Sequence, residues 1–176
     1  MKSTRPTSDL TAHLGYWLRY VSNHVSQAFA RKVETRGVTV AEWVLLHQLL
    51  GAEPLAPSRV AERLGMTRGA ITKLADRLIA KSLLVRNADP EDGRAQTLAL
   101  TVKSRKLVPE LAALADANDS QFFDHLSPKD RATFLRILRG IVDARGLKSV
   151  LTSEDAAKSC GLGAVAGSPI FRPQIT

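Results

Sequence analysis

Cationic and hydroxyl side chains recur between positions 67 and 94, with spacings suited to hydrogen bonding with a polyanion. Arg68 has a planar guanidinium, which can donate two hydrogen bonds to O6 and N7 of a guanine and so discriminate between bases by about 1–3 kcal/mol. Lys73 and Arg77 follow on the same segment and have the charge that phosphate groups attract. An ordinary solvated helix surface carries the same residue types, so the interpretation depends on what surrounds them.

Asp92 and Arg94 stand two positions apart in a stretch rich in turn-forming residues. At this spacing the carboxylate can orient the guanidinium toward a narrow minor groove. The alternative is a surface pair that only stabilises a turn, which would contribute less than about 1 kcal/mol. The surrounding basic segment favours the first interpretation.

The positive charge of the chain is concentrated in its middle. The formal net charge is +8, and residues 59–106 contain 11 Lys and Arg against 5 Asp and Glu, whereas the flanking segments are close to neutral. Such a patch indicates a polyanionic partner, and together with the guanidinium pattern it predicts binding to duplex DNA. The predicted contact residues are Thr67, Arg68, Gly69, Thr72, Lys73, Arg77, Arg86, Asp92 and Arg94.

Two short helices joined by a Gly-containing turn are expected to position these side chains. Pro57 favours the start of the first helix, Gly65 lies in the turn, and Thr67 can cap the second helix. The expected inward faces are Val60, Ala61 and Leu64 on the first helix and Ile71, Leu74, Ala75 and Leu78 on the second. This arrangement is typical of a helix-turn-helix.

Two short strands follow, at 83–87 and 96–101, and residues 89–93 supply Pro, Asp and Gly for the turn between them. The sequence therefore predicts a mainly α fold with a small β-wing, a winged helix-turn-helix. A shorter helix is expected at 40–50, and longer amphipathic helices are expected at 10–36 and in two pieces within 103–146. Their apolar stripes would be costly to leave in water, so they favour dimerisation through the N- and C-terminal helices.

Four regions are expected along the chain. Residues 1–38 form an N-terminal dimerisation helix, 39–102 the DNA-binding domain, 103–146 the C-terminal dimerisation helices, and 147–176 a tail that is mobile or draped on the partner chain.

The stretch from Thr67 to Arg86, followed by AspProGluAspGlyArgAlaGlnThrLeuAlaLeuThr at 89–101, resembles the MarR family of bacterial regulators. The resemblance extends from about Leu10 to Arg145. It implies a homodimer that binds an inverted repeat in DNA and represses transcription. It also implies that a small aromatic acid or a related effector, such as its thioester, releases the protein from DNA. Two positions depart from the family pattern: Ser82 replaces a helix-ending Gly, and Gly93 replaces a wing Arg.

Aromatic and imidazole side chains suggest where an effector would bind. His13, Trp17, Tyr20 and His24 recur at spacings of four, three and four, and Trp43 and His47 lie one turn apart on the next helix. The two helices meet below the DNA-binding domain in the family, so the predicted effector residues are His13, Trp17, Arg19, Tyr20, Trp43 and His47. The alternative is that these rings pack a dimer interface.

Other classes of function find little support. No phosphate loop, metal motif or nucleophile elbow is visible, so no enzyme, metal or cofactor is expected. Cys160 is the single cysteine and has no evident activating partner. The first residues lack a secretory pattern and no long apolar run occurs, which predicts a cytoplasmic protein. The alternative to a specific regulator is a winged-helix module that coats DNA or binds proteins without an effector.

Overall fold

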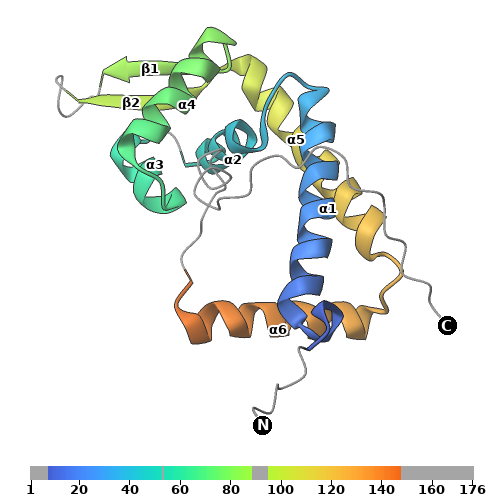
Figure 1. Ribbon diagram of the computed structural model, residues 1–176. Helices are drawn as coiled ribbons and strands as arrows, with labels where there is room; N and C mark the ends of the chain where they lie inside the picture. The colour runs from blue at the N-terminus through green and yellow to red at the C-terminus, as the bar shows by residue number, and fades with distance from the viewer. Residues whose placement is uncertain (1–7, 53, 89–94, 148–176) are drawn as a thin grey trace, which may run out of the picture.

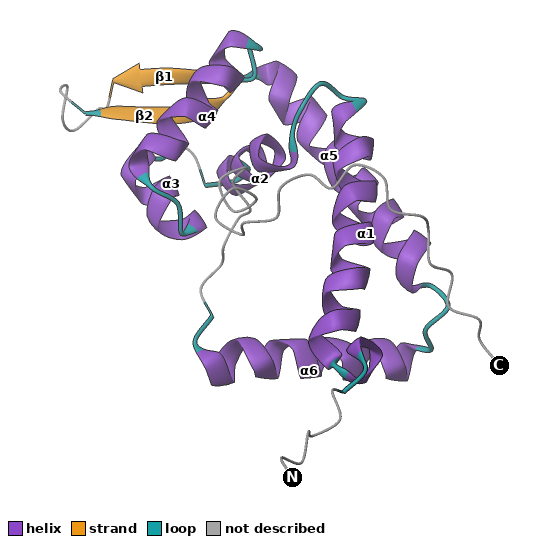
Figure 2. Ribbon diagram, viewed as in Figure 1, coloured by secondary structure: helices purple, strands orange, loops and turns teal. Residues whose placement is uncertain are grey.

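The computed structural model describes residues 8–52, 54–88 and 95–147 (Figure 1). Most of these residues are helical, and the described strands form one hairpin, as Figure 2 shows. Along the chain the elements are η1 (Leu10–Ala12), α1 (Leu14–Glu34), α2 (Val40–Leu49), α3 (Pro57–Leu64), α4 (Arg68–Ala80), β1 (Leu84–Ala88), β2 (Gln96–Leu100), α5 (Val102–Phe123) and α6 (Pro128–Arg145). The predicted mainly α fold with a small wing is confirmed.

The helix-turn-helix forms as its sequence predicts. Pro57 starts α3, Gly65 ends it in the left-handed conformation with a φ of 62°, and the Thr67 hydroxyl caps α4 by accepting from the Ala70 N–H at 3.2 Å. The residues predicted to face inward on both helices are buried: Val60, Ala61, Leu64, Ile71, Leu74, Ala75 and Leu78. The buried inner face therefore holds α4 in place with its outer face directed to solvent.

The wing is an antiparallel pair in which Arg86 of β1 stands opposite Leu98 of β2. Leu55, just before α3, adds a short third segment to this sheet, which the sequence did not predict. Its N–H donates to the Leu98 carbonyl at 3.2 Å, and the Leu98 N–H donates back at 2.8 Å. The sheet is thereby joined to the helix-turn-helix at both ends of that motif.

Ser82 adopts a φ of 57°, so the bend between α4 and β1 keeps the left-handed geometry that a glycine would normally supply. Its N–H donates to the Ile79 carbonyl at 2.8 Å, and its own carbonyl accepts from the Thr101 hydroxyl at 3.0 Å. These hydrogen bonds fix the bend although the residue is not glycine.

The start of α1 differs from the single helix expected from residue 10 to residue 36. Asp9 caps a short 3-10 turn, η1, and His13 is extended, so that α1 begins only at Leu14. Asp9 accepts from the Thr11 hydroxyl at 2.8 Å, and this bond, helped by the Thr11 N–H, lowers the pKa of the Asp9 carboxyl. The local cap stops the helix from continuing to residue 10.

The C-terminal half of α1 packs against α5, and together they support α2 and the winged helix. Lys32 on α1 donates to the side-chain carbonyls of Asn118 at 2.7 Å and Gln121 at 2.6 Å on α5. The N-terminal half of α1 and the whole of α6 lie apart from this packed core. No residue of α6 is buried, and Figure 1 shows α6 at the end of α1 that is distant from the winged helix.

Candidate nucleic-acid interface

The outer face of α4 presents the residues that the sequence predicted to contact DNA. Thr67, Arg68, Gly69, Thr72 and Lys73 are all exposed. Within the described part of the chain, the side chains of Arg68 and Lys73 have no hydrogen bond or ion pair. Both cations on this face are therefore available to an external partner.

Gly69 and Thr72 shape the same face in different ways. A Cβ added at Gly69 would meet no atom within 4 Å, so the protein itself leaves this position open. The absence of a side chain there allows a partner to approach the helix backbone. The Thr72 hydroxyl donates to the Arg68 carbonyl at 3.0 Å, which leaves its oxygen free to accept a hydrogen bond.

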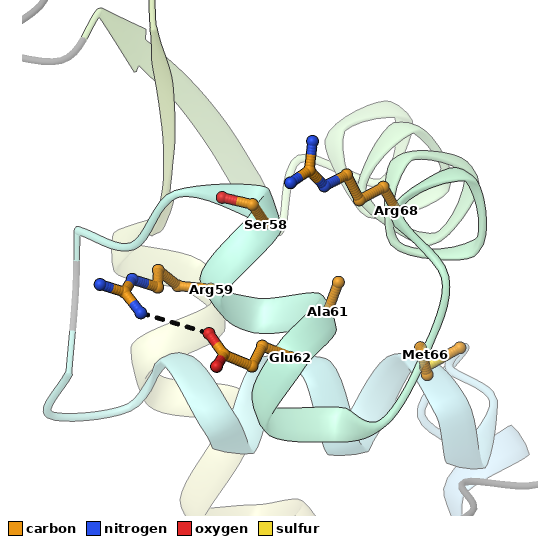
Figure 3. A pocket seen from close by; sticks show the side chains of 6 residues that line it. All are labelled: Ser58, Arg59, Ala61, Glu62, Met66 and Arg68. Atoms are coloured by element: carbon orange, nitrogen blue, oxygen red, sulfur yellow. Dashed lines mark hydrogen bonds and ion pairs between the residues drawn. The ribbon is translucent and has the colours of Figure 1, made fainter.

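A recess of about 460 Å³ separates α3 from the start of α4. In Figure 3 the Arg68 guanidinium extends from α4 toward α3, where Ser58 lines the opposite wall of the recess. Arg59 also lines it and donates to Glu62 at 3.2 Å. Ser58 and Arg59 were not among the predicted contacts; the signal that could have found them is their place directly after Pro57, at a helix start.

Arg77 lies on the flank of α4 and contacts an acid of its own domain. Its Nε is 3.6 Å from Oε1 of Glu42, a buried residue of α2. Lys81, at the end of α4, donates to both oxygens of the same carboxylate, at 2.9 Å and 2.7 Å. The charge of Arg77 is thus partly neutralised within the protein, and its contact with DNA stays a prediction.

Arg86 on β1 also has an internal partner. Its Nη2 lies 2.6 Å from Oδ1 of Asp76 on α4, and both side chains are partly exposed. The predicted wing contacts Asp92 and Arg94, and Gly93 between them, lie outside the described residues. Of the nine predicted DNA contacts, five therefore lie on α4, Thr67 is its N-cap, and Arg86 lies on β1 in an ion pair with α4.

The predicted effector residues form two separate clusters in one chain. The rings of Tyr16, Trp17, Tyr20 and His24 follow each other along the exposed half of α1, with centroids 4.6–6.4 Å apart. The Trp17 Nε1 donates to the Thr11 carbonyl at 2.8 Å. Arg19 is exposed on the same half of α1, and His13 is exposed at its N-cap.

Trp43 and His47 form the second cluster on α2. The centroid of the Trp43 ring lies 5.0 Å from that of Phe29 of α1, which it contacts edge-on, and 5.5 Å from that of His47. Twelve residues separate Trp17 from Phe29, which corresponds to about 18 Å along a helix. Among the described residues the two sets therefore lie at separate places along α1 and α2, and a cavity lined by both stays a prediction. The Trp43 Nε1 is buried and has no hydrogen-bond partner among the described residues.

An apolar groove of about 520 Å³ runs between the N-terminal half of α1 and α6. Its walls are exposed aliphatic and aromatic side chains of both helices: Leu14, Trp17, Leu18, Val21, Phe134, Ile137 and Ile141. In the described ranges, no helix has the length and apolar character needed to cross a membrane, and no group of three or more metal-ligating side chains occurs.

Comparison with known proteins gives consistent matches. The sequence model of the MarR family matches residues 36–95. A protein of Thauera aromatica described as a transcriptional regulatory protein for the hcr operon is 27% identical over 131 residues, covering 74% of this chain and 79% of that protein. The HTH-type transcriptional repressor MdtR of Bacillus subtilis is 27% identical over 113 residues, covering 64% of this chain and 73% of MdtR.

Solved structures match over a larger part of the chain. The PcaV transcriptional regulator of Streptomyces coelicolor, in complex with its natural ligand, superposes with a TM-score of 0.66 at 25% identity, covering 80% of this chain and 99% of PcaV. All three proteins are regulators of transcription by their descriptions.

Proposed function

Because this chain belongs to the MarR family of winged helix-turn-helix transcriptional regulators, we propose that it binds a pseudo-palindromic DNA operator as a homodimer and represses transcription. The observation that carries this proposal is the outer face of α4, where Arg68 and Lys73 have no partner among the described residues while the inner face is fixed in the core. The similarity to the repressor MdtR supports repression as the mode of action.

The residues divide by the groups that they would contact. Arg68, near the N-terminus of α4, would read a guanine in the major groove, because side chains at this end of a recognition helix reach base edges. Lys73 would contact phosphate, and Arg59 and Ser58 on α3 would position the sugar-phosphate backbone beside the recess. Arg94 would enter the neighbouring minor groove.

A second copy of the chain is the occupant that best fits the groove between α1 and α6. The groove is apolar, and the exposed aliphatic stripe continues along α6 through Leu135 and Val142. Burial of each large side chain would contribute roughly 1.5–3 kcal/mol, and a monomer would leave them all in water. Two winged helices joined in this way would place their recognition helices about 34–36 Å apart, one turn of duplex.

Selection from a random-sequence duplex pool tests the function. The wild-type protein is expected to enrich an inverted repeat and to keep it in the presence of excess competitor DNA at physiological salt. Enrichment of no sequence, with binding that competitor removes, would identify a DNA-coating module; absence of any DNA binding would leave a protein-interaction module. Either result contradicts the proposal.

We also propose that a small aromatic acid, or a related effector such as its thioester, releases the protein from DNA. The support is the cluster around Trp43, where a buried indole N–H lacks an acceptor beside Phe29 and His47. A bound carboxylate or carbonyl would satisfy that donor, and an aromatic ring would stack on the neighbouring rings. In a dimer, Arg19 would be a second group able to pair with a carboxylate. PcaV, which has the same fold, was solved with its natural ligand.

A further inference from the structure

Glu42 is a fully buried carboxylate on the first turn of α2. Its Oε2 accepts from the Thr39 N–H at 2.8 Å and from the Lys81 Nζ at 2.7 Å. Its Oε1 accepts from the same Nζ at 2.9 Å and lies 3.6 Å from the Arg77 Nε. A buried charge is costly unless it is paired and hydrogen-bonded, and here both oxygens are engaged.

Both cations that pair with Glu42 belong to the C-terminal end of the recognition helix. Lys81 is the C-cap of α4, and its Nζ also donates to the Gly37 carbonyl in the turn between α1 and α2, at 2.9 Å. The Lys81 carbonyl accepts from the Lys103 Nζ of α5 at 3.2 Å. Lys81 therefore connects the end of α4 to the turn between α1 and α2, to α2 itself and to α5.

Because α4 is long, a small change of orientation at its C-terminal end shifts the residues at its N-terminal end. A helix of 13 residues is about 20 Å long, so a tilt of a few degrees at Lys81 moves Arg68 by more than about 1 Å. Specific recognition needs its side chains held within about 0.5 Å. The buried apolar face of α4 limits its distance from the core, but non-directional apolar contacts define its tilt less sharply than paired hydrogen bonds do.

We infer that Glu42 is a positioning residue for DNA recognition, which acts through Lys81 and Arg77 by fixing the orientation of α4 without touching DNA itself. The inference rests on the proposed function. It assigns Lys81 and Arg77 a role different from that of Lys73, whose side chain has no internal partner among the described residues.

Glu42→Gln tests the contribution of the negative charge separately from the capping of α2. Glutamine serves the third position of a capping box as glutamate does, so the bond to the Thr39 N–H is kept while the negative charge is lost. Lys81→Gln removes the other partner at a half-exposed position. Glu110→Gln on α5 is the matched control, because it breaks an exposed ion pair with Arg36, which follows α1, and this pair does not involve α4.

The experiment measures dissociation constants of full-length wild type, the three single variants and the Glu42→Gln/Lys81→Gln double variant. The probes are a duplex that the wild type selects from a random pool and a scrambled duplex, at several salt concentrations, with melting temperatures measured alongside. We expect each of Glu42→Gln and Lys81→Gln to weaken binding to the selected duplex about tenfold, and the double variant to bind no worse than the singles. The salt dependence should not fall, the scrambled duplex should be bound as before, and Glu110→Gln should match the wild type.

A folded Glu42→Gln that binds like the wild type would overturn the inference. So would additive effects, or a Lys81→Gln variant whose salt dependence falls by about one counterion, since Lys81 would then contact phosphate directly. If Glu42→Gln does not fold, Lys81→Gln decides alone: weaker selected binding at unchanged salt dependence supports the inference, and unchanged binding overturns it. A wild type that selects no sequence refutes the proposed function and the inference together.

Discussion

Arg86 of β1 and Asp76 of α4 are joined by an ion pair in which Nη2 and Oδ1 lie 2.6 Å apart. The pair links the wing to the recognition helix on the side of α4 away from Glu42. The helix is therefore held by charge on two flanks, by Asp76 and Arg86 on one and by Glu42 with Arg77 and Lys81 on the other.

Asp76→Asn distinguishes orientation from simple electrostatics. Loss of a negative charge beside the DNA-facing surface would strengthen binding if phosphate attraction alone mattered. We expect binding to weaken instead, several-fold, because Arg86 loses the partner that orients its guanidinium. The free energy of unfolding should change by less than about 1 kcal/mol, since the pair is partly exposed. Fluorescence anisotropy with a labelled duplex measures the affinity, and the control is Asp116→Asn at an exposed position of α5. Tighter binding by Asp76→Asn would refute the assignment.

Arg68→Ala and Arg94→Ala should have different effects on sequence preference. Arg68→Ala is expected to cost about 1–3 kcal/mol and to relax the preference at one position of each half-site, because the guanidinium reads a base. Arg94→Ala should weaken binding across many sequences. Repeating the pool selection with each variant measures both effects, with Lys106→Ala on α5 as the control for loss of one positive charge. Wild-type affinity and preference in both arginine variants would show that these contacts are wrongly assigned.

Ser82→Gly should stabilise the fold by about 1 kcal/mol. Ser82 has a φ of 57°, a conformation that costs an L-residue about 1–2 kcal/mol and glycine very little. Ala80→Gly, two residues earlier in the last turn of α4, is the matched control and should destabilise by up to about 1 kcal/mol. Urea denaturation at one fixed protein concentration gives both values, because dimer stability depends on concentration. Equal or lower stability of Ser82→Gly would contradict the strain argument.

Ile137→Glu should convert the proposed dimer to a monomer. Ile137 is half-exposed on the α6 wall of the apolar groove, where a second copy would have to bury the new carboxylate without a partner. Arg136→Glu introduces the same side chain on the opposite face of α6 and should leave the dimer intact. Sedimentation equilibrium reports the mass of each variant; a dimeric Ile137→Glu would place the interface elsewhere.

The two tryptophans provide a direct test of effector binding. In a Trp17→Phe variant, Trp43 is the single indole, and we expect benzoic or cinnamic acids or their thioesters to change its fluorescence while lowering the affinity for DNA. Trp43→Phe keeps a ring but removes the buried donor, so it should bind the same compound about tenfold more weakly. If no compound in the panel weakens DNA binding by the wild type, the effector proposal fails and the aromatic rings are packing residues.

The helix-turn-helix could be predicted from the sequence because its signals are local. The spacing of Ile71, Leu74 and Leu78 defines the buried face of α4 within three turns, and Gly65 and Thr67 define the turn and the cap with neighbours at most four residues away. The outward position of Arg68 and Lys73 follows from the same periodicity. A local cap also explains why the predicted start of the first helix was wrong, since Asp9 forms η1 and delays the start of α1 to Leu14.

Pairings between distant residues depended on tertiary structure. Glu42 meets Lys81 across 39 positions, and Leu55 joins the sheet through Leu98, because packing of α2, α3 and α5 around one core brings these segments together. The periodicity of each helix states which side is apolar, but not which charge of another helix will lie beside its end. The sequence by itself therefore determined which face of α4 is exposed, whereas the tertiary structure alone decided that Arg77 and Lys81 face a buried carboxylate and Lys73 does not.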